Sequence, residues 1–237
     1  MLFIRSLLFY ACLIPLAIFF GGLCLVLWIV PYAIRHRILI GFNWFALKSL
    51  QLCCGISVEV RGQENIPDQP VVIMAKHQST FETFFLQLYF APLSTILKQE
   101  LLRIPFFGWG LALLRPIAID RGNPRAALKK VKTEGMKRLE EGNNVLVFPE
   151  GTRTPLGQVG NYARSGADIA IAANAPVLAI AHNAGLHWPM HTLTKHPGKI
   201  QVSIGEPIYP EGRNSREMTE EVKNWIEAQI ADMPDAV

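Results

Sequence analysis

Hydrophobic positions are distributed unevenly along the chain, and the longest apolar run stands near its beginning. No residue from Leu7 to Ile34 carries a charge, and as one helix this run would be roughly 40 Å long, more than the hydrocarbon core of a bilayer needs. The run is too long for the apolar core of a secretory signal, and no small-residue cleavage site follows it. The pattern therefore predicts a membrane segment that is retained.

Proline and glycine residues within this run leave two forms of attachment open. As a single helix, the run would span the bilayer. If Pro15, the Gly21-Gly22 pair and Pro31 break it, two shorter helices would lie in one leaflet. The sequence does not decide between these two arrangements.

Basic residues are concentrated behind the run rather than in front of it. Arg35, His36 and Arg37 follow it, whereas only Arg5 precedes it. Because positively charged flanks stay on the cytoplasmic side of a membrane, we expect the rest of the chain to face the cytoplasm.

A second apolar stretch, from Ile38 to Cys54, also contains Asn43 and Lys48. This mixture is typical of an interfacial amphipathic helix, and a core helix packed against the following domain fits it almost as well. We expect residues 1–54 to form a membrane anchor with an amphipathic helix, and residues 55–237 to form one folded domain.

Beyond Gly55 the pattern changes to short β-branched runs that alternate with polar or amphipathic segments. Such runs predict the strands of an α/β sheet that is covered by helices on both faces. Apolar residues recur at helical spacing from Pro124 to Glu141, where Gly142 ends the pattern, and again from Ser215 onward. The predicted strands are ISVEV, VVIMA, STIL, PIAI, NVLVF, VLAIA and IQVSI.

Composition and charge agree with a membrane-bound domain. The 237 residues suffice for one α/β core, and a chain that is 50% apolar and 18% charged is shifted toward the membrane class. The net charge of +4 includes no basic run that suggests nucleic acid, and it suits a mild attraction to anionic lipid. The cysteines all lie in the apolar first part, where their spacing suits neither a disulfide framework nor a zinc site: Cys12, Cys24, Cys53 and Cys54.

The first motif with chemical potential is KHQSTFE, from Lys76 to Glu82, directly after the predicted buried strand VVIMA. On one helix His77 and Glu82 would point about 140° apart. With His77 in the turn before a helix that begins at Ser79 or Thr80, the carboxylate reaches back to the imidazole. Such a pair accepts a proton from a hydroxyl nucleophile, with the carboxylate fixing the tautomer of the histidine.

The second motif is FPEGTR, from Phe148 to Arg153, which follows the predicted strand VLVF. Open α/β sheets bind ligands at the carboxyl ends of their strands, so both motifs are expected at one edge. Gly151 allows a close approach of the backbone, and Arg153 offers a planar fork for an anion such as phosphate.

Other catalytic motifs are missing from the sequence. It contains no GxSxG nucleophile elbow, no P-loop and no dinucleotide fingerprint. The missing nucleophile elbow favours direct attack by an acceptor hydroxyl over a covalent enzyme intermediate.

HQSTFE and PEGTR, in this order and about seventy residues apart, resemble the HX4D and EGTR blocks of the 1-acylglycerol-3-phosphate acyltransferases, also called lysophosphatidate acyltransferases. LKQELLRIPFFGWG followed by AIDRG is similar to the acceptor-binding segment of that family, and APVLAIAHNAG is similar to its fourth block. The resemblance extends from Val71 to His182 and, more loosely, to the later GEPI segment.

This resemblance implies a fold, a reaction and a location. The fold is a mixed α/β sheet flanked by helices, with an N-terminal membrane-embedded segment and a catalytic acyltransferase domain at 55–237. The reaction transfers a fatty acyl group from acyl-ACP or acyl-CoA, as co-substrate and without a cofactor, to the 2-hydroxyl of 1-acyl-sn-glycerol-3-phosphate, giving phosphatidate. The partners are the lipid acceptor, the thioester carrier and the bilayer, with the catalytic domain on the cytoplasmic side of a bacterial inner membrane.

The resemblance also implies roles for particular residues. His77 is the general base and Glu82 its partner, whereas Pro176 shapes the floor of the site. The acceptor site is implied to consist of Lys98, Arg121, Glu150, Gly151, Thr152 and Arg153.

The chain departs from the family pattern at Glu82, where aspartate is usual. One extra methylene changes the reach of the carboxylate and not its charge, so we expect function to be retained with a shifted backbone. Two alternatives stay open: acylation of another lysolipid, and a non-catalytic lipid-binding protein of the same fold.

Four later histidines do not predict a metal site. His187 and His191 have the spacing of ligands on one helix, but Pro189 between them argues against that helix. The remaining two, His182 and His196, add no ligand pattern of their own.

Overall fold

A seven-stranded sheet forms the centre of the computed structural model, which describes residues 1–233. All seven predicted strands belong to it, in the order β1-β7-β6-β2-β5-β3-β4. Neighbouring strands run parallel except β6 and β7, so the sheet is mixed, as predicted. The strands are β1 (Ile56–Arg61), β2 (Val72–Ala75), β3 (Leu93–Lys98), β4 (Ile117–Ile119), β5 (Asn144–Val147), β6 (Val177–His182) and β7 (Gly198–Ile204).

Strands β2 to β6 all point in one direction, which brings their carboxyl ends to the same edge of the sheet. The KHQSTFE and FPEGTR segments follow β2 and β5, which are hydrogen-bonded neighbours. The expectation that both motifs meet at one edge is therefore confirmed.

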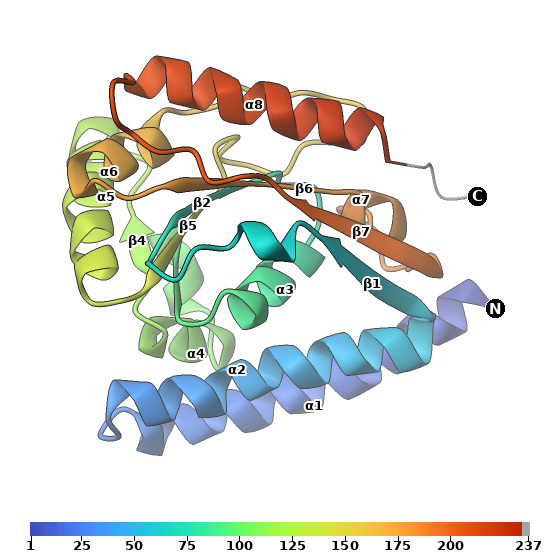
Figure 1. The fold of residues 1–237 in the computed structure, drawn as a ribbon. Coiled ribbons are helices and arrows are strands. Elements are labelled where there is room, and N and C mark those ends of the chain that lie inside the picture. The colour runs from blue at the N-terminus through green and yellow to red at the C-terminus, as the bar shows by residue number, and fades with distance from the viewer. Residues whose placement is uncertain (234–237) are drawn as a thin grey trace.

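Helices cover both faces of the sheet (Figure 1). Side chains of successive strand residues point to opposite faces, and β2 is buried on both: Ile73 and Ala75 pack with α3 (Phe81–Tyr89), whereas Val72 and Met74 pack with residues of three other helices. Those helices are α5 (Pro124–Glu140), α6 (Ser165–Ala173) and α8 (Ser215–Ala231). Both helices predicted from apolar spacing are present, and asparagine caps start them at Asn123 and Asn214.

Shorter helical segments connect these layers. Two of them are α-helices and two are 3₁₀ turns, and they lie between strands of the sheet. They are α4 (Phe107–Leu113), α7 (Ala184–His187), Gln63–Asn65 and Gln99–Arg103.

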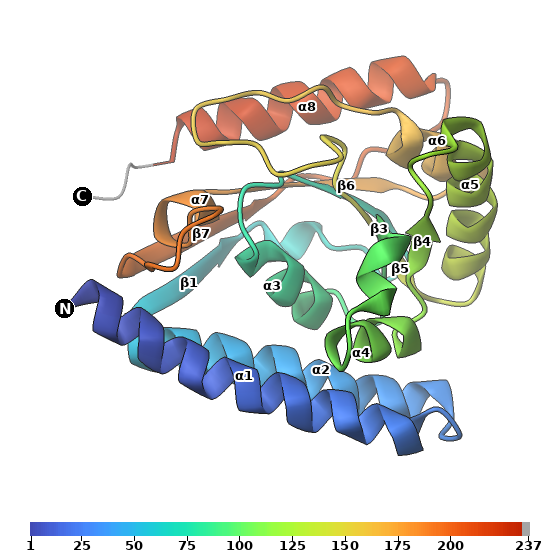
Figure 2. The same ribbon diagram turned by 180° about the vertical axis from the view of Figure 1, so that it is seen from behind.

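The apolar N-terminal part forms an antiparallel pair of helices, here called the hairpin (residues 2–54) (Figures 1 and 2). Its first helix is α1 (Leu2–Leu27), and its second is α2 (Tyr32–Ser49), which continues as a π-helix at Leu50–Cys54. The run is divided into two helices, as in one of the two arrangements that the sequence left open, and only Pro31, directly before α2, stands at the break. Pro15 and the glycine pair lie inside α1 and do not break it.

The hairpin is packed against the sheet domain along α1. Near its start, Phe9 is fully buried and meets the ring of Trp188 edge-on at 5.2 Å. Near its end, an added Cβ on Gly21 would lie 2.4 Å from the Cβ of Phe106, so only glycine allows this approach. The helix pair and the sheet therefore share one continuous core.

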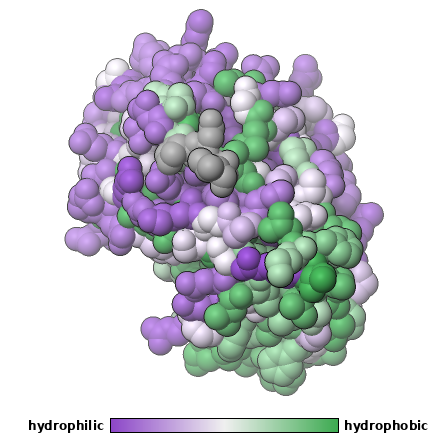
Figure 3. All heavy atoms as spheres, turned by 90° about the vertical axis from the view of Figure 1, so that its right-hand side faces the viewer, coloured by the Kyte–Doolittle hydropathy of each residue, from purple (hydrophilic) through white to green (hydrophobic). Residues whose placement is uncertain are grey.

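The outer side of the hairpin is strongly apolar. By length and composition, α1 is the one helix among residues 1–233 that could cross a membrane. Figure 3 shows the apolar side chains gathered at one end of the molecule, and most large exposed apolar residues belong to the hairpin, including Phe19, Leu25, Trp28, Ile29 and Trp44. This surface has the character of a lipid-facing one.

Candidate active site

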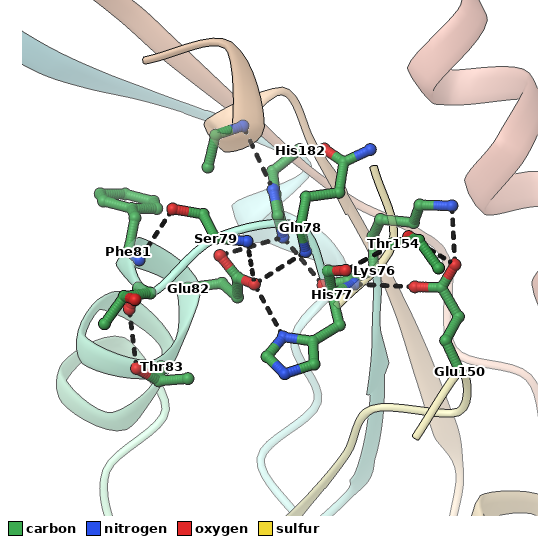
Figure 4. Close-up of polar contacts among 12 residues, drawn as sticks. Lys76, His77, Gln78, Ser79, Phe81, Glu82, Thr83, Glu150, Thr154 and His182 are labelled. Atoms are coloured by element: carbon green, nitrogen blue, oxygen red, sulfur yellow. Dashed lines mark hydrogen bonds and ion pairs between the residues drawn. The ribbon is translucent and has the colours of Figure 1, made fainter. Parts of the chain in front are cut away.

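The turn after β2 is shaped by hydrogen bonds from its own side chains (Figure 4). Thr80 caps α3, within the predicted start. The Glu82 carboxylate accepts from the backbone N–H groups of Gln78 and Ser79, and the Ser79 hydroxyl accepts from the N–H of Phe81. The N–H of Phe81, the first residue of α3, is thereby satisfied, and the Glu82 carboxylate holds the turn before the helix.

His77 and Glu82 are in direct contact, as the sequence predicts. The Nδ1 atom of His77 lies 2.8 Å from Oε1 of Glu82. Burial by itself raises the pKa of Glu82, but the His182 and His77 imidazoles and the Ser79 N–H outweigh it and hold that pKa below its usual range. An ionised Glu82 accepts the proton on Nδ1, which leaves Nε2 on the opposite edge of the ring as the proton acceptor.

The imidazole of His77 also contacts the second motif. Its ring stacks on Phe148 with centroids 4.0 Å apart and planes 15° from parallel. The backbone N–H of Thr154 donates to the His77 carbonyl over 2.8 Å. The two motifs are therefore one rigid unit.

Glu150 lies behind the site, contrary to the expectation that it completes the acceptor wall. Its side chain is fully buried, its Oε2 accepts from the N–H of His77 at 3.0 Å, and its Oε1 accepts from the Thr154 hydroxyl at 2.9 Å. The carboxylate is thus used to join the two loops. Gly151 follows with φ of +70°, a conformation that favours glycine.

Sequence reasoning missed the role of Lys76. Residues 73 and 75 face α3, so residue 76 points to the opposite face. There its fully buried ammonium lies 2.9 Å from Glu150 and 2.8 Å from Glu227 of α8. The side chain of Glu227 also accepts from the hydroxyl of Tyr162. The signal that could have placed this side chain is the strand alternation, because Lys76 directly follows the last residue of β2.

A cavity of about 600 Å³ opens beside His77. Three cationic side chains contribute to its wall, namely Lys98 at the end of β3, Arg121 after β4 and Arg153 after β5. The expectation that these residues come together is confirmed, and Gly151 and Thr152 line the same cavity. The site therefore combines a histidine–carboxylate pair with positive charge at the carboxyl edge of the sheet.

The rest of the cavity wall is largely apolar, and the hairpin and α4 contribute to it together with parts of α3, β3 and α5. Such a lining suits a hydrocarbon chain. Apolar residues in this part of the wall include Ala17, Phe20, Leu39, Phe42, Leu111 and Leu114.

Pro176 does not shape the floor of the site. It precedes β6, and its carbonyl accepts from the N–H of Val72 at the start of β2. Because β2 and β6 are parallel, Pro176 lies at the amino edge of the sheet, whereas His77 lies at the carboxyl edge. The resemblance placed Pro176 correctly before the strand, but a residue at that end of β6 cannot form the floor of a site at the other end.

The later histidines are separated by the fold. The Nδ1 atom of His187 is hydrogen-bonded to the backbone carbonyl of His196 at 3.1 Å. His191 lines the cavity, whereas His182 is buried beside Glu82. Within residues 1–233 there is no group of three or more His, Cys, Asp or Glu side chains that could hold a metal ion.

Comparison with known proteins identifies the family of this site. The model of the acyltransferase family matches residues 57–183, which include both motifs. The chain belongs to the acyltransferase family. It is 48% identical over 236 residues to the 1-acyl-sn-glycerol-3-phosphate acyltransferase of Pseudomonas aeruginosa, covering 97% of this chain and 91% of that protein.

Two further relatives extend this comparison. A yeast 1-acyl-sn-glycerol-3-phosphate acyltransferase, from Saccharomyces cerevisiae, is 36% identical over 107 residues, which are 44% of this chain and 35% of that protein. The crystal structure of PlsC, the 1-acyl-sn-glycerophosphate acyltransferase of Thermotoga maritima, matches with a TM-score of 0.80 and 26% identity, over 97% of this chain and 94% of that one. This acyltransferase is therefore an enzyme, and the non-catalytic alternative is set aside.

Proposed function

We propose that this acyltransferase moves a fatty acyl group from acyl-ACP or acyl-CoA to the 2-hydroxyl of 1-acyl-sn-glycerol-3-phosphate, giving phosphatidate. The observation that carries the proposal is the His77–Glu82 pair in the wall of a cavity that is cationic on one side and apolar on another. The names of the Pseudomonas and Thermotoga relatives support the choice of acceptor.

The proposed reaction is one direct displacement. Nε2 of His77 accepts the proton of the acceptor hydroxyl while the oxygen attacks the thioester carbonyl. The C–S bond of the tetrahedral intermediate then breaks, and the thiolate leaves with the proton from the imidazolium. Glu82 stabilises the imidazolium throughout, because its ionised carboxylate lies 2.8 Å from Nδ1. The reaction balances without a metal or an organic cofactor.

In this proposal the acceptor phosphate is bound by Lys98, Arg121 and Arg153. A phosphate carries up to two charges, and guanidinium groups match its oxygens with paired hydrogen bonds. The apolar part of the cavity would receive an acyl chain, which reaches the enzyme from the lipid around the hairpin.

The experiment that tests the function is acyl transfer by the detergent-purified protein. Labelled acyl-ACP and acyl-CoA are offered separately with 1-acylglycerol-3-phosphate and a panel of lysolipids that lack a phosphomonoester. Phosphatidate as the main product supports the proposal. Transfer to another lysolipid alone would replace the acceptor, and the two donors are ranked by their kcat/KM.

Replacing Arg153 with alanine is expected to lower kcat/KM for 1-acylglycerol-3-phosphate about 10- to 100-fold, which corresponds to the loss of a charge-assisted hydrogen bond. The fold should be retained, because Arg153 lies in a loop at the cavity and is only half-buried. The matched control is Arg216→Ala, at an exposed position at the start of α8. Equal kinetics for wild type and Arg153→Ala would remove Arg153 from the acceptor site.

We further propose that the hairpin lies in one leaflet on the cytoplasmic side of the inner membrane. Its two ends are tied together, since Nε of Arg5 donates to the carbonyl of Cys53 at 2.8 Å. Its α1 helix also packs on the sheet domain near both ends. Both features favour a monotopic anchor over a spanning helix.

This arrangement predicts that the N-terminus lies on the same side of the membrane as the catalytic domain. An epitope placed before Met1 should be cleaved by protease in sealed inside-out vesicles, and should be protected in right-side-out ones. A second epitope after residue 237 is the control for the catalytic side. Opposite protection of the two epitopes would establish a spanning helix.

A further inference from the structure

A second histidine lies behind the His77–Glu82 pair, on the neighbouring strand. His182 is the last residue of β6, which pairs with β2, and it is 1% exposed. Its Nε2 lies 2.9 Å from the carbonyl oxygen of Lys76, the residue before His77, and its Nδ1 accepts from the N–H of Ala184 at 3.3 Å. Because Nδ1 is an acceptor, Nε2 carries the proton and donates a hydrogen bond to the backbone carbonyl of Lys76.

The carboxylate of Glu82 is used unequally by its surroundings. Oε1 takes three contacts, from His77, Gln78 and Ser79, whereas the buried Oε2 has no hydrogen-bond partner among residues 1–233. The protonated Nε2 of His182 lies 4.0 Å from this oxygen (Figure 4). An unpartnered carboxylate oxygen in a buried site is costly unless positive charge or a dipole faces it.

We propose that His182 is a positioning residue for the base. Its N–H edge holds the turn before His77 through the Lys76 carbonyl, and it stabilises the negative charge on Oε2 of Glu82. It is buried and does not line the cavity, so it acts through the His77–Glu82 pair, and the proposal rests on the proposed role of that pair. The longer Glu82, in place of the aspartate usual in the family, gives one oxygen to His77 and leaves the other near His182.

The charged groups around His182 determine the sign of the expected effect. Glu82 faces it from α3, and His77 and Lys76 from the loop after β2, with the Lys76 ammonium directed to the other face. Burial lowers the pKa of His182, so the ring is neutral and supplies an N–H dipole. If this dipole is removed, the Glu82–His77 pair holds its proton more tightly. The apparent pKa of the acid limb in the pH profile of kcat/KM then rises.

Two substitutions in the full-length purified enzyme separate this role from simple packing. His182→Leu removes the donor, and we expect the acid limb to move up by about 0.5 to 1 pH unit, the shift that corresponds to one net hydrogen bond. His182→Gln retains a donor, and we expect the limb to return to the wild-type position. If kcat/KM of His182→Leu fell by the same factor at every pH and the acid limb of its pH profile did not move, His182 would be an ordinary core residue. That result would overturn the proposal.

A second readout does not depend on turnover. In protein labelled with ¹⁵N-histidine, the Nδ1–H signal of His77, identified by its absence in His77→Ala, should shift or broaden in His182→Leu and recover in His182→Gln. An unchanged signal in His182→Leu would also reject the proposal. If His182→Leu is too unstable to purify, His182→Asn is used instead, because its shorter side chain moves the N–H donor away from Glu82. Activity retained by His77→Ala would instead overturn the proposed function, while this signal would still decide the positioning role.

Discussion

Replacing His77 with alanine is expected to lower kcat about 10²- to 10⁴-fold, the usual contribution of a general base. The acceptor hydroxyl would then have to attack the thioester without losing its proton. KM for the acceptor should change little, because the cations assigned to its phosphate come from the end of β3 and from the loops after β4 and β5, and not from the turn that holds His77. Initial rates with saturating acyl donor, measured across acceptor concentrations, separate the two constants.

Two controls accompany this variant. His196→Ala removes a histidine whose side chain is outside the cavity, and it should keep the wild-type rate. The thermal midpoint of His77→Ala should remain near that of the wild type, because Oε1 of Glu82 keeps its backbone donors at Gln78 and Ser79. A loss of rate below about threefold would assign the base to another group.

Replacing Lys76 with methionine is expected to lower the free energy of unfolding by about 3–5 kcal/mol. Methionine has a similar length, so the main change is the loss of the ammonium between Glu150, which is fully buried, and Glu227, which is 21% exposed. Each carboxylate would be left without its cation, and the loops of both motifs would lose their common tie to α8. The thermal midpoint in detergent should fall by about 10 °C, given the size of the chain.

The chain offers a matched control for this substitution. Lys199 and Glu59 form an ion pair of the same length, 2.9 Å, but on the exposed surface. Lys199→Met should leave the midpoint unchanged, because water solvates the remaining carboxylate. The double variant Lys76→Met/Glu227→Gln should recover part of the lost stability. Equal midpoints for the Lys76 and Lys199 variants would mean that the buried network carries no net stabilisation.

The elements of the sheet were predictable because each strand is a short apolar run with clear ends. The start of α3 was predictable for a related reason, since Thr80 occupies the N-cap position and the Ser79 hydroxyl accepts from the N–H of Phe81, the first residue of the apolar helix. The contact between His77 and Glu82 followed from this boundary and from the reach of a glutamate. Local sequence therefore contained the geometry of the His77–Glu82 pair.

The features that sequence reasoning missed depend on which way a side chain points. A lysine next to a histidine motif and a glutamate next to an arginine are ordinarily solvent-facing. In this fold Lys76 and Glu150 point inward and neutralise each other, which becomes visible only once β2, β5 and α8 are brought together. His182 is a similar case, because its partner Glu82 lies 100 residues earlier in the chain and on a different element.

The N-terminal run shows a different limit. No charge interrupts it, so hydropathy alone suggests one long segment, and four potential breakers lie within it. Only Pro31 stands at a break, where it precedes the first turn of α2. Pro15 is accommodated inside α1, as happens where neighbouring groups satisfy the freed carbonyl.

The position of β1 has a consequence for biosynthesis. β1 forms the edge of the sheet beside β7, with Ile56 paired to Gly198, and Ser6 of α1 accepts from the N–H of Lys195. At about 5–20 residues per second, the ribosome finishes β7 roughly 7 to 29 seconds after β1. The hairpin therefore emerges long before the surface it packs on, and its apolar outer side can bind the bilayer first. We expect nascent chains to be delivered to the membrane before the catalytic edge of the sheet exists, so that a half-made enzyme never has to keep this segment soluble in the cytoplasm.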